Sequence, residues 1–256
     1  MKTYIINFSP TGTTKAVLES IAEGMGNETT LYDITPADSS VSAEITDGIA
    51  LFGVPVYAGR VPLICAERMK NITSDGAPAV VVAVYGNRAY EDALVELRDI
   101  VSDAGFSVVA GGAFIGEHSY SSAEKPVAQG RPDSADRQCA KDFGSMVMKK
   151  ILSGITQTPE MNGNVPYKER MGIKGATPQT KTELCGSCGT CTDVCPTDAI
   201  TIDSTSSSDV EKCIMCCACV KECPADARYI AHQGILERID MLYKNCSARK
   251  EPELFI

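Results

Sequence analysis

Cysteines are the residues whose spacing in this sequence points most directly to chemistry. Ten of the twelve lie beyond residue 180, and eight of these form two runs with the same spacing. The first is Cys185-x2-Cys188-x2-Cys191-x3-Cys195-Pro196, and the second is Cys213-x2-Cys216-x2-Cys219-x3-Cys223-Pro224. Thiolates in this pattern hold [4Fe–4S] clusters, with three cysteines of a run on one cluster and the fourth on the other. We therefore expect two clusters with two ligand sets, which are Cys185, Cys188, Cys191 and Cys223, and Cys213, Cys216, Cys219 and Cys195.

Structural zinc is the alternative for such a cysteine-rich segment. Zinc sites use pairs of cysteines set well apart and need no third cysteine close by, so the spacing favours clusters. Cys217 is an additional cysteine inside the second run. The register of the run favours Cys216 as the ligand and leaves Cys217 unbound. The other three cysteines, Cys65, Cys139 and Cys246, lie on predicted helical faces and are expected to be small core residues.

A second candidate site is the loop Ser9-Pro10-Thr11-Gly12-Thr13-Thr14, which joins an apolar run at residues 3–8 to a helical stretch. Its glycine frees backbone amides, its hydroxyls add donors, and the helix N-terminus completes a site for an anion. The chain has neither the G-x-x-x-x-G-K-S/T motif for nucleoside triphosphates nor the G-x-G-x-x-G motif for dinucleotides. The loop therefore predicts a phosphate held by hydroxyls and amides alone, with a plain helix cap as the alternative.

Strands and helices alternate around this loop through residue 153. Apolar runs at 29–34, 49–57, 79–87 and 106–116 predict further strands, and helical patterns begin near Thr14, Pro62, Glu91 and Asp133. This alternation predicts an α/β domain with a doubly wound, five-stranded parallel sheet, whose ligand site lies beyond the carboxyl ends of the strands. Residues 154–180 predict a linker or wrapping segment, and the cysteine runs occupy 181–232. Residues 233–256 predict a last helix and a tail, with the helix packing back on the body of the protein.

The phosphate loop is similar to the S/T-x-T-G-x-T loop that binds the FMN phosphate in flavodoxins, and residues 1–153 resemble that family. The cysteine runs resemble the bacterial two-cluster ferredoxins over about 50 residues. Together the two parts resemble the flavodoxin–ferredoxin fusion proteins of anaerobic bacteria and archaea. The resemblance implies a flavodoxin-like domain followed by a small α+β ferredoxin-like domain, with FMN and two [4Fe–4S] clusters as cofactors.

The resemblance also implies which residues contact FMN. They are Ser9, Thr11, Gly12, Thr13 and Thr14 at the phosphate, and Pro55, Val56, Tyr57, Ala58, Gly59, Gly86, Asn87, Arg88, Tyr90 and Asp92 in the loops after the third and fourth strands. Tyr57 and Tyr90 are the candidates for stacking on the flavin, with ordinary loop packing as the alternative. The chain has no tryptophan to cover the ring, so one flavin face is either open or covered by the second domain. His118 follows the fifth strand and is a candidate for donating to the flavin or moving protons, with a surface histidine as the alternative. No other catalytic residue is assigned.

Composition limits the partners and the compartment. A net charge of −9 argues against nucleic acid or anionic lipid as a partner. No segment approaches the roughly 18 apolar residues of a membrane span, and the N-terminal residues lack the pattern of a signal peptide. We therefore expect a cytoplasmic protein, where disulfides are rare and many cysteines indicate metal.

The two cofactor types together predict an electron-transfer flavoprotein. A cluster carries one electron and FMN accepts one or two, so a chain with both can pass single electrons between low-potential carriers. Redox proteins, a ferredoxin or a reductase, are the expected partners. The first alternative is an FMN-dependent reductase of a small organic substrate, fed by the clusters, with residues 116–132 over the flavin. A redox sensor or scaffold is the second alternative.

Overall fold

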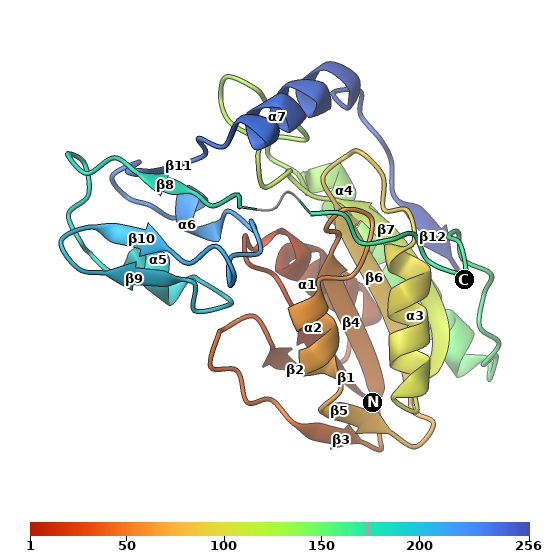
Figure 1. Ribbon diagram of the computed structural model, residues 1–256. Helices are drawn as coiled ribbons and strands as arrows, with labels where there is room; N and C mark the ends of the chain where they lie inside the picture. Colours follow the sequence, from red (N-terminus) through yellow and green to blue (C-terminus); the bar gives the residue numbers. More distant parts are fainter. Residues whose placement is uncertain (173–174) are drawn as a thin grey trace.

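A parallel β-sheet forms the centre of the computed structural model, which describes residues 1–172 and 175–256 (Figure 1). Its parallel strands stand in the order β2-β1-β4-β6-β7. Their bounds are Lys2–Asn7 (β1), Glu28–Asp33 (β2), Ile49–Pro55 (β4), Pro78–Tyr85 (β6) and Ser107–Ile115 (β7). Counted along the chain this is the order 2-1-3-4-5 of the flavodoxin fold. The predicted flavodoxin-like sheet is confirmed.

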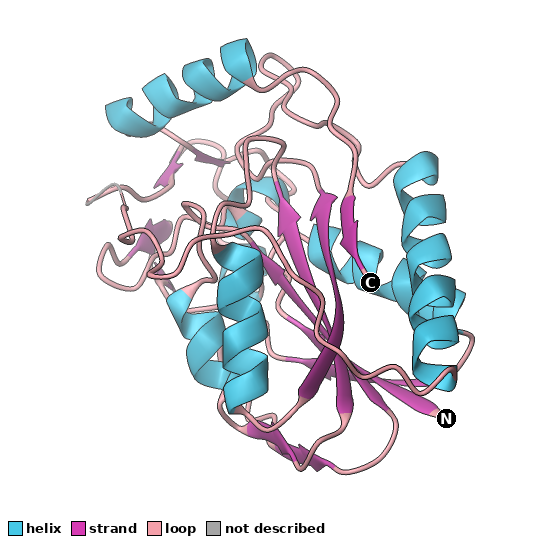
Figure 2. Ribbon diagram, turned by 90° about the vertical axis from the view of Figure 1, so that its right-hand side faces the viewer, coloured by secondary structure: helices cyan, strands magenta, loops and turns pink. Residues whose placement is uncertain are grey.

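Helices cover both faces of the sheet, as the doubly wound arrangement requires (Figure 2). On one face α1 (Thr13–Met25) and α4 (Ser134–Leu152) pack together over Ile5, Leu51 and Val82. The two helices approach so closely that a Cβ on Gly24 would lie 1.9 Å from the carbonyl oxygen of Lys141. The other face carries α2 (Leu63–Met69) and α3 (Ala93–Asp103). A short parallel pair, β3 (Ala43–Ile45) and β5 (Ile72–Ser74), lies outside the main sheet.

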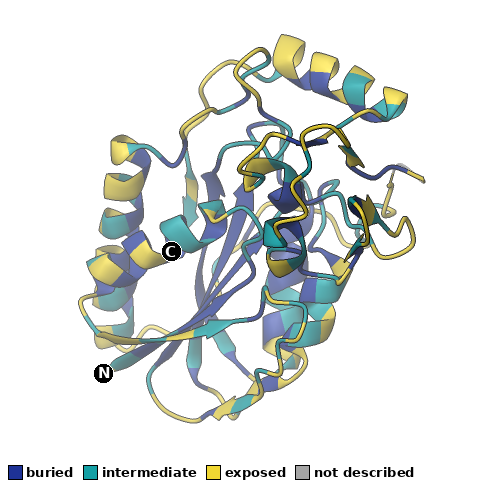
Figure 3. Cartoon of the chain, turned by 90° about the vertical axis from the view of Figure 1, so that its left-hand side faces the viewer, coloured by how far each residue is buried: buried dark blue, intermediate teal, exposed yellow. Residues whose placement is uncertain are grey.

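The buried strands explain why this domain folds as it does. β4, β6 and β7 are buried along almost their whole length, because helices cover both of their faces (Figure 3). The predicted cap of α4 is present as a capping box. The Asp133 carboxylate accepts from the backbone N–H groups of Ala135 and Asp136, and the Asp136 carboxylate accepts from the N–H of Asp133.

The segment after α4 wraps along the first domain. Met161 is buried against the sheet, and the Asp92 carboxylate accepts from the backbone N–H groups of Asn164 and Lys168. Arg170 pairs with the buried Glu96. The predicted linker, 154–180, includes residues 173 and 174, which lie outside the described part of the chain. Its last two residues, Gln179–Thr180, form β8 of the second domain.

The second domain is small and built twice from the same unit. Each unit has one turn of helix, α5 (Thr190–Asp193) or α6 (Ala218–Lys221). Two antiparallel strand pairs complete the domain. They are β9 (Ile200–Ile202) with β10 (Ser206–Ser208), and β8 with β11 (Arg228–Tyr229). The predicted small α+β ferredoxin-like domain is confirmed. It lies at the carboxyl-end edge of the parallel sheet (Figure 1).

The C-terminal segment returns to the first domain. Helix α7 (Gln233–Asn245) buries Ile235, Ile239 and Leu242, and β12 (Glu253–Phe255) then pairs antiparallel with β7. The central sheet thus gains a sixth strand that the sequence did not predict. In the described part of the chain, no helix has the length and the apolar character needed to cross a membrane.

Candidate metal centres and cofactor pocket

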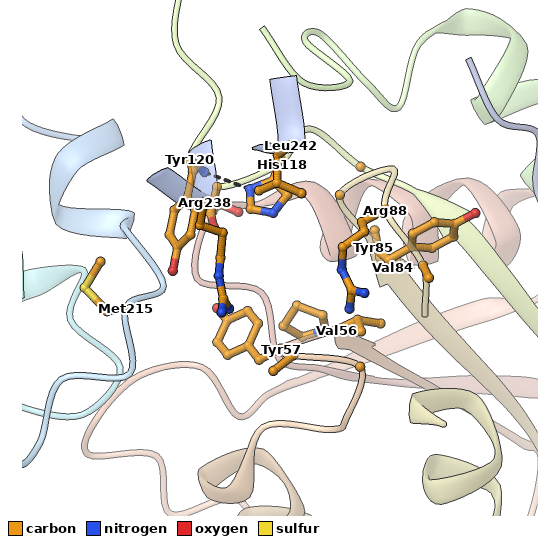
Figure 4. A pocket seen from close by; sticks show the side chains of 18 of the residues that line it. Val56, Tyr57, Val84, Tyr85, Arg88, His118, Tyr120, Met215, Arg238 and Leu242 are labelled. Atoms are coloured by element: carbon orange, nitrogen blue, oxygen red, sulfur yellow. Dashed lines mark hydrogen bonds between the residues drawn. The ribbon is translucent and has the colours of Figure 1, made fainter. Parts of the chain in front are cut away.

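A cavity of about 450 Å³ opens at the carboxyl ends of the parallel strands (Figure 4). Four loops of the first domain line it, those that follow β1, β4, β6 and β7. Residues 213–215 of the second domain, residues 168, 171 and 172 of the wrapping segment, and α7 complete its walls. Its volume lies in the range of small-molecule and cofactor sites. A cavity therefore lies beyond the strand ends, where the ligand site was predicted, and residues of both domains line it.

The loop before α1 has the features of an anion site. Thr11 and Thr13 line the cavity, and Gly12 adopts a left-handed conformation with φ of 78° just before the helix. Gly12 offers no side chain to cap α1, and in the first turn of the helix the N–H of Lys15 is taken by the Ser9 hydroxyl. The Thr14 hydroxyl is buried without a hydrogen-bond partner. These free donors fit a phosphate group.

Ser9 stands apart from the other loop residues. Its hydroxyl accepts from the N–H of Lys15 at 3.1 Å, and its own N–H donates to the Thr35 hydroxyl at 2.8 Å. Ser9 does not line the cavity, and its hydrogen bonds hold the shape of the loop.

Tyr57 stands in the floor of the cavity. Residues 57–60 form a tight turn in which Tyr57 and Arg60 exchange both backbone hydrogen bonds, at 3.0 and 3.1 Å. Ala58 and Gly59 both have positive φ, 51° and 82°, which turns the chain back at once. Pro55, Val56, Ala58 and Gly59 line the same wall, as predicted from the resemblance. Burial raises the pKa of Tyr57 well above its usual value, so this phenol stays neutral.

The loop after β6 corrects three predicted contacts. Gly86 and Arg88 line the cavity, but Asn87, Tyr90 and Asp92 do not. The Tyr90 hydroxyl donates to Glu253 of β12 at 2.6 Å, and Tyr90 packs against Tyr85, so the predicted stacking role is wrong for Tyr90. Asn87 holds the C-terminal segment and Asp92 holds the wrapping segment. Both side chains use their hydrogen-bonding groups on residues far away in sequence, so they hold segments of the chain together.

His118 lies in the wall of the cavity as a neutral donor. Its ring packs so close to Gly86 that a Cβ there would meet it at 2.4 Å. The backbone N–H of Tyr120 donates to Nδ1 of His118 at 3.0 Å, which leaves the proton of the neutral ring on Nε2. Burial lowers the pKa of His118 to about 4, with the positive charges of Arg88, Lys221 and Arg238 acting in the same direction.

Two arginines bring positive charge to the cavity. Arg88 and Arg238 extend from opposite walls toward the floor that Val56 and Tyr57 form (Figure 4). Arg88 is paired with Glu91 at 2.7 Å. Arg238 belongs to α7, and nothing in the sequence apart from the apolar face of this helix indicated that it would reach the site. Other lining residues missed from the sequence are Val84, Tyr85, Lys168, Met171, Ile214, Met215, Ile235, Met241 and Leu242.

The cysteines of the second domain gather into two groups. Four of them surround one small hollow and are here called the outer group, namely Cys185, Cys188, Cys191 and Cys223. The other four are called the inner group, namely Cys195, Cys213, Cys216 and Cys219. Cys195, Cys213 and Cys219 share one hydrophobic cluster, which also includes Cys191 of the outer group, and the charges of Cys195, Cys213 and Cys219 all act on Cys216. Each group thus contains three cysteines of one run and the fourth cysteine of the other run.

The two groups differ in exposure. In the outer group Cys188 is exposed, and hydrogen bonds from Thr190 lower the pKa of its thiol. In the inner group burial raises the pKa of Cys216 to about 12. Cys213 lines the wall of the cavity described above. Cys213 therefore places the inner group beside the cavity, while Cys188 gives the outer group one exposed thiol.

The backbone repeats around both groups. The N–H of Ala199 donates to Sγ of Cys195 and the N–H of Ala227 donates to Sγ of Cys223, each at 3.3 Å. Left-handed residues also stand at equivalent positions, in the pairs Ser187 and Met215, Gly189 and Cys217, and Asp198 and Asp226. Such amide contacts to sulfur are typical of cluster sites.

The repeat also explains the position of Cys217. It stands where the first run has Gly189, at a left-handed turn before α6. Its thiol is buried and lies 3.6 Å from the carbonyl oxygen of Met215. This position agrees with the expectation that Cys216, and not Cys217, belongs to the ligand set.

The donor sets fit clusters better than single ions. Among the described residues, no three His, Cys, Asp or Glu side chains are placed as ligands of one metal ion. A four-iron cube binds each thiolate to a different iron, so its ligands stand farther apart than those of zinc. All twelve cysteines are free thiols.

Comparison with known families decides the nature of the second domain. Residues 177–247 match the family described as "4Fe-4S dicluster domain". This part of the chain is similar to 4Fe-4S dicluster domains. The prediction of two [4Fe–4S] clusters is thereby confirmed.

Solved structures of flavodoxins are similar to the first domain. An archaeal flavodoxin is 16% identical with a TM-score of 0.40, over 59% of this chain and 99% of that chain. A flavodoxin of Streptococcus pneumoniae TIGR4 is 15% identical with a TM-score of 0.42, over 59% and 99%. Rubredoxin oxygen:oxidoreductase from Desulfovibrio gigas is 14% identical with a TM-score of 0.40, over 61% of this chain and 37% of that one. The flavodoxin-like fold itself rests on the strand order, and no curated protein matches the sequence.

Proposed function

We propose that this chain transfers single electrons between two [4Fe–4S] clusters and an FMN bound in the cavity. One observation carries the proposal. Cys213, a member of the inner cysteine group, lines the same cavity as the loops that follow β1, β4, β6 and β7. A cluster at the inner group would therefore adjoin a cofactor in the cavity with no further carrier between them.

The residues around the cavity fit FMN. Thr11, Thr13 and the open N-terminus of α1 would hold the phosphate, and Thr14 offers a buried donor without a partner. Tyr57 offers an aromatic face, and His118 offers a neutral N–H donor. When bound, FMN accepts one or two electrons, which matches it to clusters that carry one each. Helix α7 and residues 213–215 form one side of the cavity.

The cluster ligands follow the crossed arrangement. The outer group, with Cys185, Cys188, Cys191 and Cys223, binds one cluster, and the inner group binds the other. The hollow that the outer cysteines surround and the common environment of the inner ones support this assignment. The exposure of Cys188 makes the outer cluster the point where a partner would exchange electrons, and the inner cluster connects it to the cavity.

The partners we infer are redox proteins, since nothing in the charge or the cysteine pattern favours nucleic acid. We also infer a cytoplasmic location, where disulfides are rare and many cysteines indicate metal. The alternative, reduction of a small organic substrate, is not favoured. Its support would be His118 and Arg238, and a bound flavin accounts for both.

Cofactor analysis of anaerobically purified protein tests the proposal. We expect iron and sulfide for two four-iron clusters, one FMN in the acid extract, and reduction of all three centres by a reduced low-potential ferredoxin. Cys188→Ser should lower the iron content, and Cys139→Ser, on α4, is the matched control that should not. Zinc in place of iron would overturn the cluster half of the proposal. Full iron with no flavin, even after incubation with FMN, would overturn the flavin half.

A further inference from the structure

A buried arginine lies between the two cysteine groups. Arg228 is 3% exposed and belongs to β11. Its guanidinium approaches Sγ of Cys219 in the inner group at 3.7 Å, and the same side chain lines the hollow of the outer group. Two hydroxyls complete its contacts. Thr180 accepts at 2.7 Å, and Ser208 accepts from the same nitrogen that faces Cys219.

No carboxylate balances this charge. Among residues 1–172 and 175–256, none of the ion pairs involves Arg228. Its Nε is buried and has no hydrogen-bond partner. An isolated buried cation is costly, and its burial is explained when a negative charge lies nearby. The thiolates of the two cysteine groups are the negative groups at hand.

The repeat shows that the fold itself does not require an arginine here. The segment Cys195-Pro-Thr-Asp-Ala-Ile200 corresponds to Cys223-Pro-Ala-Asp-Ala-Arg228. Ile200 is buried at the equivalent position, 8% exposed, at the start of β9. One unit thus uses an apolar side chain where the other uses a cation. The asymmetry places a positive charge at one of the two equivalent positions of the repeat.

We propose that Arg228 sets the reduction potential of the inner cluster by stabilising its reduced form. A [4Fe–4S] cluster with four thiolates is negatively charged and gains one more negative charge on reduction. A fixed cation that also donates to a ligand sulfur therefore favours the reduced state. Such a charge-assisted contact is stronger inside a protein than in water. This inference rests on the proposed ligand sets, and it adds a residue that binds no iron.

The test is a potentiometric titration monitored by electron paramagnetic resonance. Arg228→Gln removes the charge and keeps a donor, and Arg228→Lys keeps the charge. Lys212→Gln is the matched control, since it removes one positive charge from an exposed residue of the same domain. For Arg228→Gln we expect at least a tenfold fall in the reduced-to-oxidised ratio of the inner cluster at a fixed potential. For a one-electron couple that fall corresponds to about 59 mV. Cys188→Ser, which alters the outer group, identifies the signal of each cluster.

The outcomes separate this inference from the proposed function. Wild-type protein without two four-iron clusters would end the cluster proposal before Arg228 is tested. Equal shifts in Arg228→Gln and Lys212→Gln, or none, would overturn the role of Arg228. If Arg228→Gln loses its iron, Arg228→Lys decides alone. A wild-type potential in Arg228→Lys supports the charge, and a lowered potential or loss of iron in that variant overturns it in favour of a structural role.

Discussion

Asn87 connects the loop after β6 to the C-terminal segment, and its removal should loosen α7 over the cavity. Its side-chain amide donates to the carbonyl oxygens of Cys246 and Ala248, at 2.6 and 2.8 Å, just beyond the end of α7. The residue is 1% exposed and has a φ of 62°. Asn87→Gly is the substitution of choice, because glycine accepts this φ without strain. We expect α7 to open more often in this variant.

The expected size follows from the two hydrogen bonds. Each hydrogen bond contributes about 1 kcal/mol, so together they stabilise the closed position of α7 over the open one by at most about 2 kcal/mol. The Asn87 carbonyl oxygen is buried without a partner, and its burial cost offsets part of this gain. A net loss of about 1–2 kcal/mol shifts the opening equilibrium roughly 5- to 30-fold. Affinity for FMN should also fall, because Ile235 and Leu242 of α7 line the cavity. The opening equilibrium of α7 sets the upper limit of this loss.

Hydrogen exchange of residues 233–245, read by mass spectrometry, measures the opening directly. A fluorescence titration with FMN measures the affinity. Asn27→Ala is the matched control, since its side-chain amide also makes two hydrogen bonds, to Thr3 and Met148, away from the cavity. Unchanged exchange of α7 in Asn87→Gly would refute the reasoning. So would a change of equal size in Asn27→Ala.

Three further predictions concern single side chains. Cys195→Ser should reduce the iron and the paramagnetic signal of the inner group, although this residue lies in the first cysteine run; loss of the outer signal alone would contradict the crossed assignment. Burial first, then Arg88, Lys221 and Arg238, lowers the pKa of His118 from 6.5 to about 4. The unfolded chain therefore binds a proton below pH 6.5 that the folded chain does not bind until about pH 4. As the pH falls from 6.5 to 4, the free energy of unfolding should therefore fall by up to about 3 kcal/mol. Denaturation of His118→Gln should lack this dependence, and an identical pH profile would argue against the burial. Arg238→Gln should weaken FMN binding by roughly threefold and make the FMN potential more negative, because an exposed cation contributes modestly; a titration with an unchanged potential would remove Arg238 from the site.

The sequence predicted the parts that depend on local pattern. The spacing of the cysteines, the apolar runs of β4, β6 and β7, and the cap at Asp133 each follow from neighbours along the chain. The phosphate loop is of the same kind, because Gly12 and the start of α1 lie next to each other. These features could be read without knowing how the domains pack.

The errors fall on residues whose partners lie far away in sequence. Tyr90 and Asp92 follow β6, where a flavin contact was expected, but Glu253 and the backbone of Lys168 occupy them. Strand β12 has three residues, too few for an alternating pattern, and its place beside β7 depends on the fold around it. Arg238 lies on the polar side of an amphipathic helix, and only the packing of α7 brings it to the cavity.

These distant contacts also determine how the chain can work. Domains joined by one linker move relative to each other unless an interface restrains them. Here the second domain is held from both of its ends, by the wrapping segment on Asp92 and by β12 on the sheet. Contacts between the domains add to this, since Arg68 donates to the carbonyl oxygen of Pro196 at 2.7 Å and Lys221 pairs with Glu117 at 2.7 Å. Electron transfer weakens steeply with distance, so a domain held at several points keeps the inner cysteines at a constant separation from the cavity. The same contacts leave Cys188 of the outer group exposed.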